Sequence, residues 1–153
     1  YNAKNYLMEH VIGPENKLIK FNIDPLASAS SGELTSLVYG CDEKSLTGLL
    51  LGFYGFYWND NGVVYQGYAF KNLPENKALE LLNKLEKYID DEMYYISSDS
   101  DINNMFFEYD DMTFLIYRDG IIRIRVFWNG FDSEWESGAF KKTKRRFERK
   151  IKD

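Results

Sequence analysis

The sequence has little cysteine and histidine, and this scarcity excludes some chemistry. Among 153 residues there is one cysteine, Cys41, and one histidine, His10. A lone cysteine cannot form a disulfide within the chain, which favours a reducing compartment such as the cytoplasm. A thiol nucleophile needs a basic partner, and the sequence offers it only His10. We therefore expect Cys41 to be an inert small residue and the protein not to be an enzyme.

Long apolar runs are also missing. The longest, Leu49 to Trp58, is too short for the roughly 20 residues that span a bilayer as a helix. Three glycines in this region, Gly48, Gly52 and Gly55, lack the G-x-G-x-x-G spacing of a phosphate-binding loop. The sequence therefore predicts no cofactor. Because it starts at Tyr1 rather than Met, it cannot show whether a targeting signal precedes it.

Aromatic residues are abundant, at 17% of the chain, with 12 tyrosines and 11 phenylalanines. Aromatic side chains favour strands and also supply contact surfaces for partners. The hydrophobic content of 44% and the length suit one domain with a core of its own. We predict a single α+β domain over residues 1–153, in which residues 1–32 carry the least informative pattern.

The clearest strand pattern runs from Met105 to Trp128. It predicts three consecutive strands, with turns at Asp110-Asp111 and at Asp119-Gly120. A two-residue type I′ turn at the second position would fix the register of the hairpin around it. Since side chains alternate across a strand, this register assigns every residue to one of two faces.

The two predicted faces differ in character. The first is apolar, suits a core, and carries Leu115, Tyr117, Ile122, Ile124, Val126 and Trp128. The second mixes apolar with basic side chains and carries Met112, Phe114, Ile116, Phe127, Arg118, Arg123 and Arg125. Rings stack on bases and arginines bind phosphate, so the second face is a candidate anion or single-stranded nucleic-acid platform.

Shorter elements are expected before this region. Tyr1 to Ile12 predicts a short helix, and Leu18 to Ile23 predicts a strand that ends in a turn at Asp24-Pro25. A further strand is expected over Glu33 to Tyr39.

A second hairpin, Thr47 to Lys71, is expected to turn at Asn61-Gly62. Its two-residue register places strand glycines opposite aromatic rings, for example Gly55 opposite Tyr68. A ring in that position shields the bare backbone of a glycine, which gives these glycines a structural role.

Two helices are predicted from apolar periodicity. The first, at about 73–91, repeats Ala78, Leu82, Leu85 and Ile89 on one side. Together with the strands, it indicates an antiparallel sheet of five or more strands with this helix inserted and a basic helix closing the chain.

The closing helix is expected at about 134–151. A capping box that begins at Ser133 predicts its start, with Ser137 as the rival cap. Phe140 and Phe147 lie on one side of it, and basic residues fill the others.

Charge is unevenly distributed along a chain whose net charge is −5. Residues 90–136 hold 12 acidic residues against 3 basic ones, whereas residues 141–153 hold 8 basic residues against 2 acidic ones. Such asymmetry favours an electrostatic partner, although the two regions can also neutralise each other within the fold or in a dimer.

The leading functional hypothesis is a non-enzymatic protein-binding domain. Inhibitor or immunity-like proteins use acidic and aromatic surfaces against basic partners, because complementary charge speeds encounter and aromatic rings anchor the contact. The candidate partner-binding residues are Asp99, Asp101, Glu108, Asp110, Asp111, Phe114 and Phe127.

Nucleic-acid binding is the first alternative. It would use the arginine and aromatic face together with the basic helix, and its candidate residues are Arg118, Arg123, Arg125, Lys144, Arg145 and Arg149. A small oligomeric chaperone or adaptor is the second alternative, suggested only by an order of elements that resembles the type III secretion chaperones.

One acidic segment partly matches a calcium-binding loop. Asp99, Asp101 and Asn103 fall at positions 1, 3 and 5 of such a loop, but Asn104 stands where glycine is needed and Asp110 where glutamate is usual. A solvated acidic loop is the favoured interpretation, and the sequence predicts no metal.

Overall fold

The computed structural model describes residues 2–58, 60–62 and 64–152, which form an α+β fold. Its strands are β1 (Asn22–Ser28), β2 (Leu34–Cys41), β3 (Leu46–Trp58), β4 (Val64–Pro74), β5 (Met105–Tyr109), β6 (Met112–Asp119), β7 (Ile121–Trp128) and β8 (Phe131–Glu134). Its helices are α1 (Asn2–Tyr6), η1 (Leu7–Ile12), η2 (Asp42–Lys44), α2 (Glu75–Asp91), α3 (Met93–Ser98) and α4 (Ser137–Lys152). The antiparallel sheet, the inserted helix and the closing helix were all predicted and are confirmed.

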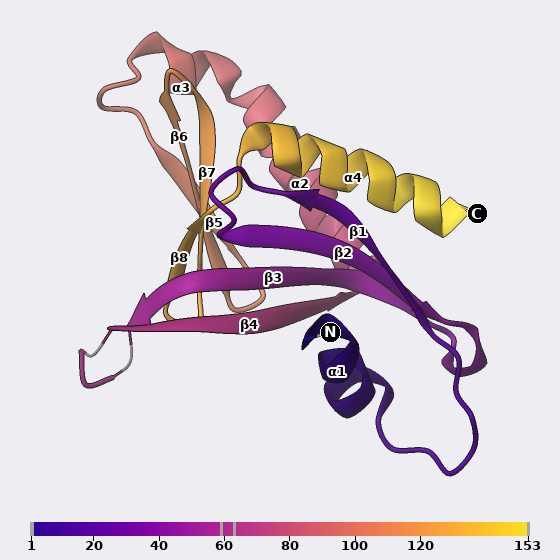
Figure 1. Cartoon of the computed structure of the whole chain (residues 1–153). Coiled ribbons are helices and arrows are strands. Elements are labelled where there is room, and N and C mark those ends of the chain that lie inside the picture. The colour runs from indigo at the N-terminus through magenta and orange to yellow at the C-terminus, as the bar shows by residue number, and fades with distance from the viewer. Residues whose placement is uncertain (1, 59, 63, 153) are drawn as a thin grey trace.

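The sheet consists of two four-stranded halves that run across each other (Figure 1). β1 to β4 form one half, and β5 to β8 form the other in the order β8-β7-β6-β5. β2 pairs with β3 only as far as Phe53, so the last residues of β3 have an open edge. β8 pairs with that edge at Tyr57–Phe131, and we call this backbone pair the seam between the halves.

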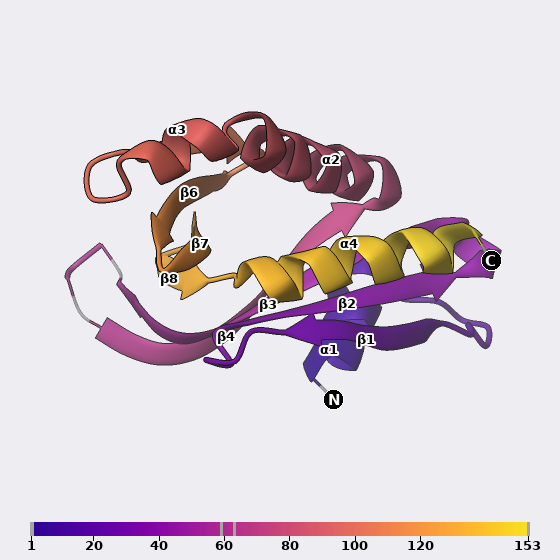
Figure 2. The ribbon, with the colours of Figure 1, turned by 90° about the horizontal axis from the view of Figure 1, so that it is seen from above.

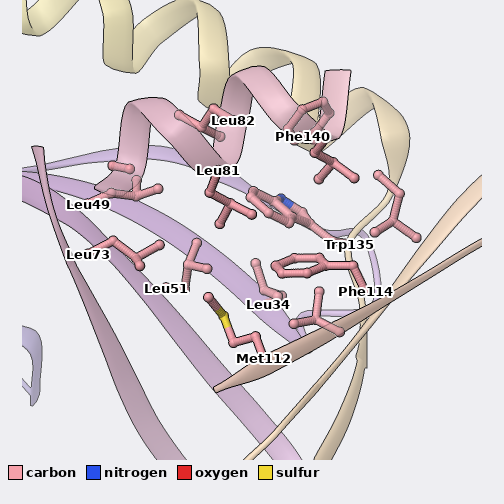
Figure 3. Close-up of a cluster of buried hydrophobic side chains, with 14 of the residues drawn as sticks. Leu34, Leu49, Leu51, Leu73, Leu81, Leu82, Met112, Phe114, Trp135 and Phe140 are labelled. Carbon is pink, nitrogen blue, oxygen red and sulfur yellow. The ribbon is translucent and has the colours of Figure 1, made fainter. Parts of the chain in front are cut away.

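The main core fills the space between the two halves and the helices α2 and α4. Figure 3 shows Leu81 of α2, Phe114 of β6 and Trp135, which precedes α4, converging on Leu51 of β3. All four side chains are at most 1% exposed. Burying one such side chain contributes about 1.5–3 kcal/mol. This shared core holds the halves together, since the described residues join them through one backbone pair.

The inserted helix agrees with its prediction. α2 starts after Pro74 and buries Ala78, Leu82, Leu85 and Ile89, the residues whose spacing predicted it. Because i, i+4, i+7 and i+11 fall on one side of a helix, these side chains meet the sheet together.

The preferred cap of the closing helix is wrong, whereas its rival is the first residue of the helix. Ser133, the expected cap, lies in β8, and the helix begins at Ser137. Asn129 and Gly130 have φ values of 51° and 83°, as a type I′ turn requires, so the chain turns back into a strand there. The predicted apolar side of the helix is confirmed, because Phe140 and Phe147 are buried.

The N-terminal helix covers the other side of the first half-sheet (Figure 2). Leu7 is fully buried against Tyr39 and Leu50, and the predicted helix over residues 1–12 is confirmed over the residues described. The predicted turn at Asp24-Pro25 is wrong, because both residues belong to β1. β1 is an edge strand with a bulge after Pro25, where a missing backbone N–H is tolerated.

The β6–β7 register differs from the prediction by one residue. Asp119 pairs with Ile121, and only Gly120 between them has a positive φ, of 77°. A one-residue shift turns every side chain of one strand to the other face. The faces predicted for β7 are correct, but those for β6 are reversed: Phe114 is in the core, and Leu115 lies on the outer face.

The β3–β4 register is also shifted by one residue. Gly55 pairs with Gly67 instead of Tyr68, so the prediction of a ring opposite Gly55 is wrong. Gly52 instead pairs with Phe70, whose ring would lie 3.2 Å from a Cβ at residue 52. The predicted turn at Asn61-Gly62 lies between residues 59 and 63, which are outside the described residues.

Candidate functional site

An open groove of about 480 Å³ lies between β5 and the end of α2 with α3. Aromatic and aliphatic side chains form most of its lining, which comprises Tyr88, Glu92, Tyr95, Met105, Phe106, Phe107 and Ile116. Phe107 forms the floor: its ring stacks on Phe114 at 5.1 Å, and the ring of Tyr88 meets it edge-on at 5.0 Å. The floor is therefore an outward extension of the core.

β5 presents an open edge beside this groove. It is the last strand of the sheet order, and no other strand of the described chain pairs with its outer edge. The predicted turn at Asp110-Asp111 is confirmed, with Tyr109 paired to Met112 across it. Tyr109 and Met112 form a hydrogen-bonded pair, and from there every second residue of β5 is hydrogen-bonded to β6. The backbone N–H and C=O groups of Glu108 and Phe106 therefore point away from β6, toward the open edge.

Large apolar side chains remain exposed around the groove. Phe106 is 69% exposed and Tyr95 is 44% exposed. α3 buries only Ile96 and leaves its tyrosines toward solvent. A cluster of exposed aromatic rings beside a strand edge marks a contact surface more often than single exposed residues do.

Four acidic residues, which we call the rim acids, lie on the elements that border the groove. Glu92 belongs to the lining, Glu108 stands on β5, and Asp99 and Asp101 lie in the turn that leads into β5. None of these four carboxylates forms a salt bridge with any residue that the structure describes. Their charge is available to a partner.

The acidic turn itself is held by local hydrogen bonds. Asn103 donates from its backbone N–H to the carbonyl of Asp99 at 2.9 Å and from its side chain to the carbonyl of Tyr95 at 2.8 Å. Within the described residues, no group of three or more His, Cys, Asp or Glu side chains is placed to hold a metal ion. The calcium-loop alternative therefore has no supporting cluster.

Asp110 and Asp111 lie at the other end of β5 and bind a lysine. The ammonium of Lys71 is 2.6 Å from Asp110 and 2.7 Å from Asp111, and Lys77 is 3.4 Å from Asp110. The hydrogen bond from Lys71 lowers the pKa of Asp110 below its usual value. Burial opposes the charge of Asp111, but bonds from Lys71 and Trp128 lower its pKa overall. These two acids are already neutralised.

The two predicted aromatic anchors are separated from the acids. Phe114 is completely buried, and Phe127 lies on the outer face of β7, 37% exposed. Of the predicted partner-binding set, only Asp99, Asp101 and Glu108 therefore combine a place on β5 or in the turn before it with the lack of a salt bridge to any described residue.

The predicted arginine platform is not assembled. Arg123 pairs with Glu134 at 3.2 Å, and Arg125 pairs with Asp132 at 2.6 Å. Arg118 belongs to the face of β6 that carries the core residues, and its guanidinium donates to the hydroxyl of Ser97 at 2.8 Å.

The residues of the basic helix fall into two groups. Lys144 binds Glu86 and Glu148, at 3.3 Å and 2.7 Å. Arg145 and Arg149, in contrast, are exposed and have no salt bridge to any described residue.

The aromatic part of the groove was missed from the sequence. α3 has six residues and one buried side chain, which is too short for a periodic apolar stripe. The signal present was the pair Tyr94-Tyr95 directly after a predicted helix, in a chain where strands hold most aromatics. The open edge of β5 is a property of the strand order, which no local pattern reports.

The groove presents an apolar surface with few polar groups. The polar groups of its lining are the carboxylate of Glu92, the hydroxyls of Tyr88 and Tyr95 and the strand backbone, and its other lining side chains are apolar. No helix among the described residues has the length and apolar character needed to cross a bilayer. In comparisons with known proteins, the chain matches no family model, and no curated protein and no solved structure is significantly similar to it.

Proposed function

We propose that the protein is a non-enzymatic binding domain that docks an extended, basic segment of a partner protein along β5. One observation carries this proposal: an unpaired strand edge borders an apolar groove whose rim acids have no cationic partner among the described residues. The single cysteine, Cys41, is buried and unpaired, which supports function in a reducing compartment such as the cytoplasm.

An added strand explains all three features together. When an extended segment pairs with a sheet edge, backbone hydrogen bonds supply affinity, and pockets for alternate side chains supply specificity. Here the alternate side chains on one side of the segment would enter the groove, where Phe107 forms the floor. The exposed rings of Phe106 and Tyr95 would be covered, and burying each is worth about 1.5–3 kcal/mol.

The rim acids define the charge of the partner. Glu92, Glu108, Asp99 and Asp101 lie on the elements that border the groove and would attract lysine and arginine side chains of the added strand. Complementary charge accelerates encounter and rejects acidic competitors. This is the behaviour expected of an inhibitor or immunity-like protein that captures a basic partner.

A second copy of the chain is the less favoured occupant. Pairing β5 with β5 of another molecule would bring the two sets of rim acids together, and like charges on facing strands oppose pairing. A sheet edge that excludes its own copy while accepting a basic strand is what a monomeric binding domain needs.

The test uses synthetic peptides as probes. Extended peptides that alternate apolar residues with lysine or arginine are titrated against the domain, alongside versions in which glutamate replaces each basic residue. We expect binding of the basic series alone. The variant Glu92→Gln/Asp99→Asn/Asp101→Asn should bind it at least about tenfold more weakly, because three rim charges are lost.

The matched control removes three acids elsewhere. Glu9→Gln/Asp42→Asn/Asp60→Asn alters exposed residues outside the groove and should leave affinity unchanged apart from a small long-range effect. An equal loss of peptide affinity in both variants would show that net charge alone causes the effect, and it would contradict docking at β5. Concentration-dependent self-association that competes with peptide would favour the second copy instead.

A further inference from the structure

α4 presents a row of cations that the fold leaves unpaired. Five cations of α4 are exposed and form no salt bridge and no side-chain hydrogen bond to any described residue. They are Lys141, Lys142, Arg145, Arg149 and Lys152. We call Lys141, Arg145, Arg149 and Lys152 the basic ridge. Their spacing of four, four and three residues places them on one stripe of the helix, about 16 Å long.

The remaining cations of α4 are all engaged. Lys144 binds Glu86 and Glu148, Lys150 is 2.7 Å from Asp24, and Arg146 donates to the carbonyl of Leu26. The two glutamates that line the same groove as the basic ridge, Glu86 and Glu148, are therefore already bound by Lys144. The fold neutralises the side of α4 that meets the sheet and leaves the outer side charged.

Stability does not explain this row. Like charges four residues apart oppose each other by about 0.2–0.5 kcal/mol per pair. Arg149 and Lys152 gain from the helix dipole at the C-terminal end, but Lys141 and Lys142 lie near the N-terminal end, where the dipole favours acids. A ligand that carries several anions would relieve the repulsion along the whole row.

The ridge borders a shallow, open groove of about 440 Å³ between α4 and α2. All four ridge residues line it, together with Lys144 and the two glutamates that Lys144 binds. The lining contains no aromatic ring and no aliphatic residue. The site therefore offers point charges and hydrogen-bond donors to a chain of anions.

We propose that the basic ridge binds the phosphodiester backbone of nucleic acid without sequence preference. A phosphate backbone supplies regularly spaced anions that release counterions when cations replace them. The ridge has no ring to stack on a base, so its contacts position the backbone and do not read sequence.

Other anionic partners fit the ridge less well. Membrane-surface helices insert an apolar side, but Ala139, Phe140 and Phe147 of α4 are buried in the core. An acidic protein would be anchored by aromatic or aliphatic residues in a desolvated centre, and the groove beside the ridge has none.

The test is a titration of fluorescent duplexes and single strands of arbitrary sequence with the full chain. Binding of the duplex through the four ridge cations would weaken about 150-fold between about 50 mM and about 200 mM salt, with a log–log slope near −3.6. In Arg145→Gln/Arg149→Gln/Lys152→Gln the slope for the duplex should move to about −0.9, because three of the four contacts are lost.

The matched control is Lys4→Gln/Lys17→Gln/Lys20→Gln, which removes three exposed charges outside α4 and should keep the slope. Absence of duplex and single-strand binding at about 50 mM salt would overturn the inference, as would an unchanged slope in the ridge variant. Vesicles rich in phosphatidylserine serve as a further probe. Binding to vesicles but to neither nucleic acid would assign the ridge to membranes and overturn it as well.

Discussion

The hydroxyl of Ser36 in β2 lies 2.6 Å from the hydroxyl of Thr143 in α4, and both side chains are fully buried. Thr143 also donates to the carbonyl of Ala139 at 2.8 Å, and Ser36 lies 3.3 Å from the carbonyl of Ala27. This pair is a fully buried polar link between the closing helix and the sheet, in addition to the contacts that Arg146 and Lys150 make with β1. It also fixes which side of α4 faces outward.

Removing this link should destabilise the protein non-additively. Thr143→Val should lower the free energy of unfolding by about 1–3 kcal/mol, because Ser36 loses a buried partner. In the Thr143→Val background, Ser36→Ala should lower the free energy of unfolding by less than it does in the wild type. The coupling free energy between the two substitutions should be about 0.5 kcal/mol or more. Urea denaturation of the four proteins measures this, and strictly additive losses would show that the two hydroxyls do not interact.

Gly48 should tolerate no side chain. A Cβ there would lie 2.7 Å from the carbonyl oxygen of Leu73 and against the ring and hydroxyl of Tyr39. Tyr39 is buried and donates to Asn72 at 2.6 Å, so it cannot move away freely. Gly48→Ala should cost about 1–3 kcal/mol of unfolding free energy.

Gly138 provides the control for that substitution. Nothing lies within 4 Å of a Cβ built on it, and it belongs to the first turn of α4. Gly138→Ala should be neutral or stabilise by up to about 1 kcal/mol. Thermal unfolding of both variants checks the contrast, and similar midpoints would refute the clash at Gly48.

The Lys71 salt bridges should make stability sensitive to acid. The pKa of Asp110 is lowered in the folded state, so its contribution is present above its unfolded pKa of about 4 and is lost as pH falls below that value. Asp110 has a φ of 58°, which asparagine also adopts, so Asp110→Asn removes the charge and keeps the turn. We expect a loss of up to about 1 kcal/mol at neutral pH.

The pH series distinguishes charge from other effects of this substitution. The difference between wild type and Asp110→Asn in unfolding free energy should shrink as pH drops below about 4, because Asp110 becomes protonated in both states. A difference that stays constant from neutral to acid pH would show that the salt bridge does not cause it.

Blocking the edge of β5 should weaken the proposed peptide docking. Glu108→Pro removes an outward N–H that β6 does not use, while Glu108→Gln removes only the charge. The proline variant should bind basic peptides about five- to tenfold more weakly than the glutamine variant. This ratio of affinities corresponds to the loss of roughly one hydrogen bond. Equal affinities of two folded variants would indicate that the edge backbone takes no part.

The elements that sequence reasoning located best have one strong local signal each. α2 combines a complete apolar stripe with Pro74 at its start, and the turn of Asp110-Asp111 separates two clear strands. Local signals of this kind do not depend on the rest of the chain, so they are sufficient by themselves.

The assignment of strand faces failed where both faces are apolar. In β6, Phe114 and Ile116 alternate with Leu115 and Tyr117, so hydrophobicity does not decide which set is buried. The decision rested on the turn type at Gly120, and an error of one residue there reversed the strand. β8 was missed because its four residues include two acids and a serine.

The candidate site depended on relationships that no local pattern encodes. Asp110 appeared equivalent to Asp99 in the sequence, yet Lys71 neutralises only the former. Arg123 and Arg145 likewise appeared equivalent, but only Arg123 has an acidic neighbour across a strand pair. Which charges remain available is decided by strand order and helix packing.

The seam between Tyr57 and Phe131 also has a consequence for folding kinetics. Forming it closes a long loop of chain, whose entropy must be overcome before the pairing contributes anything. The β6–β7 and β7–β8 hairpins, in contrast, are closed by turns of very few residues. In pulsed hydrogen exchange during refolding, amide protection should therefore arise within each half-sheet first and at the seam last.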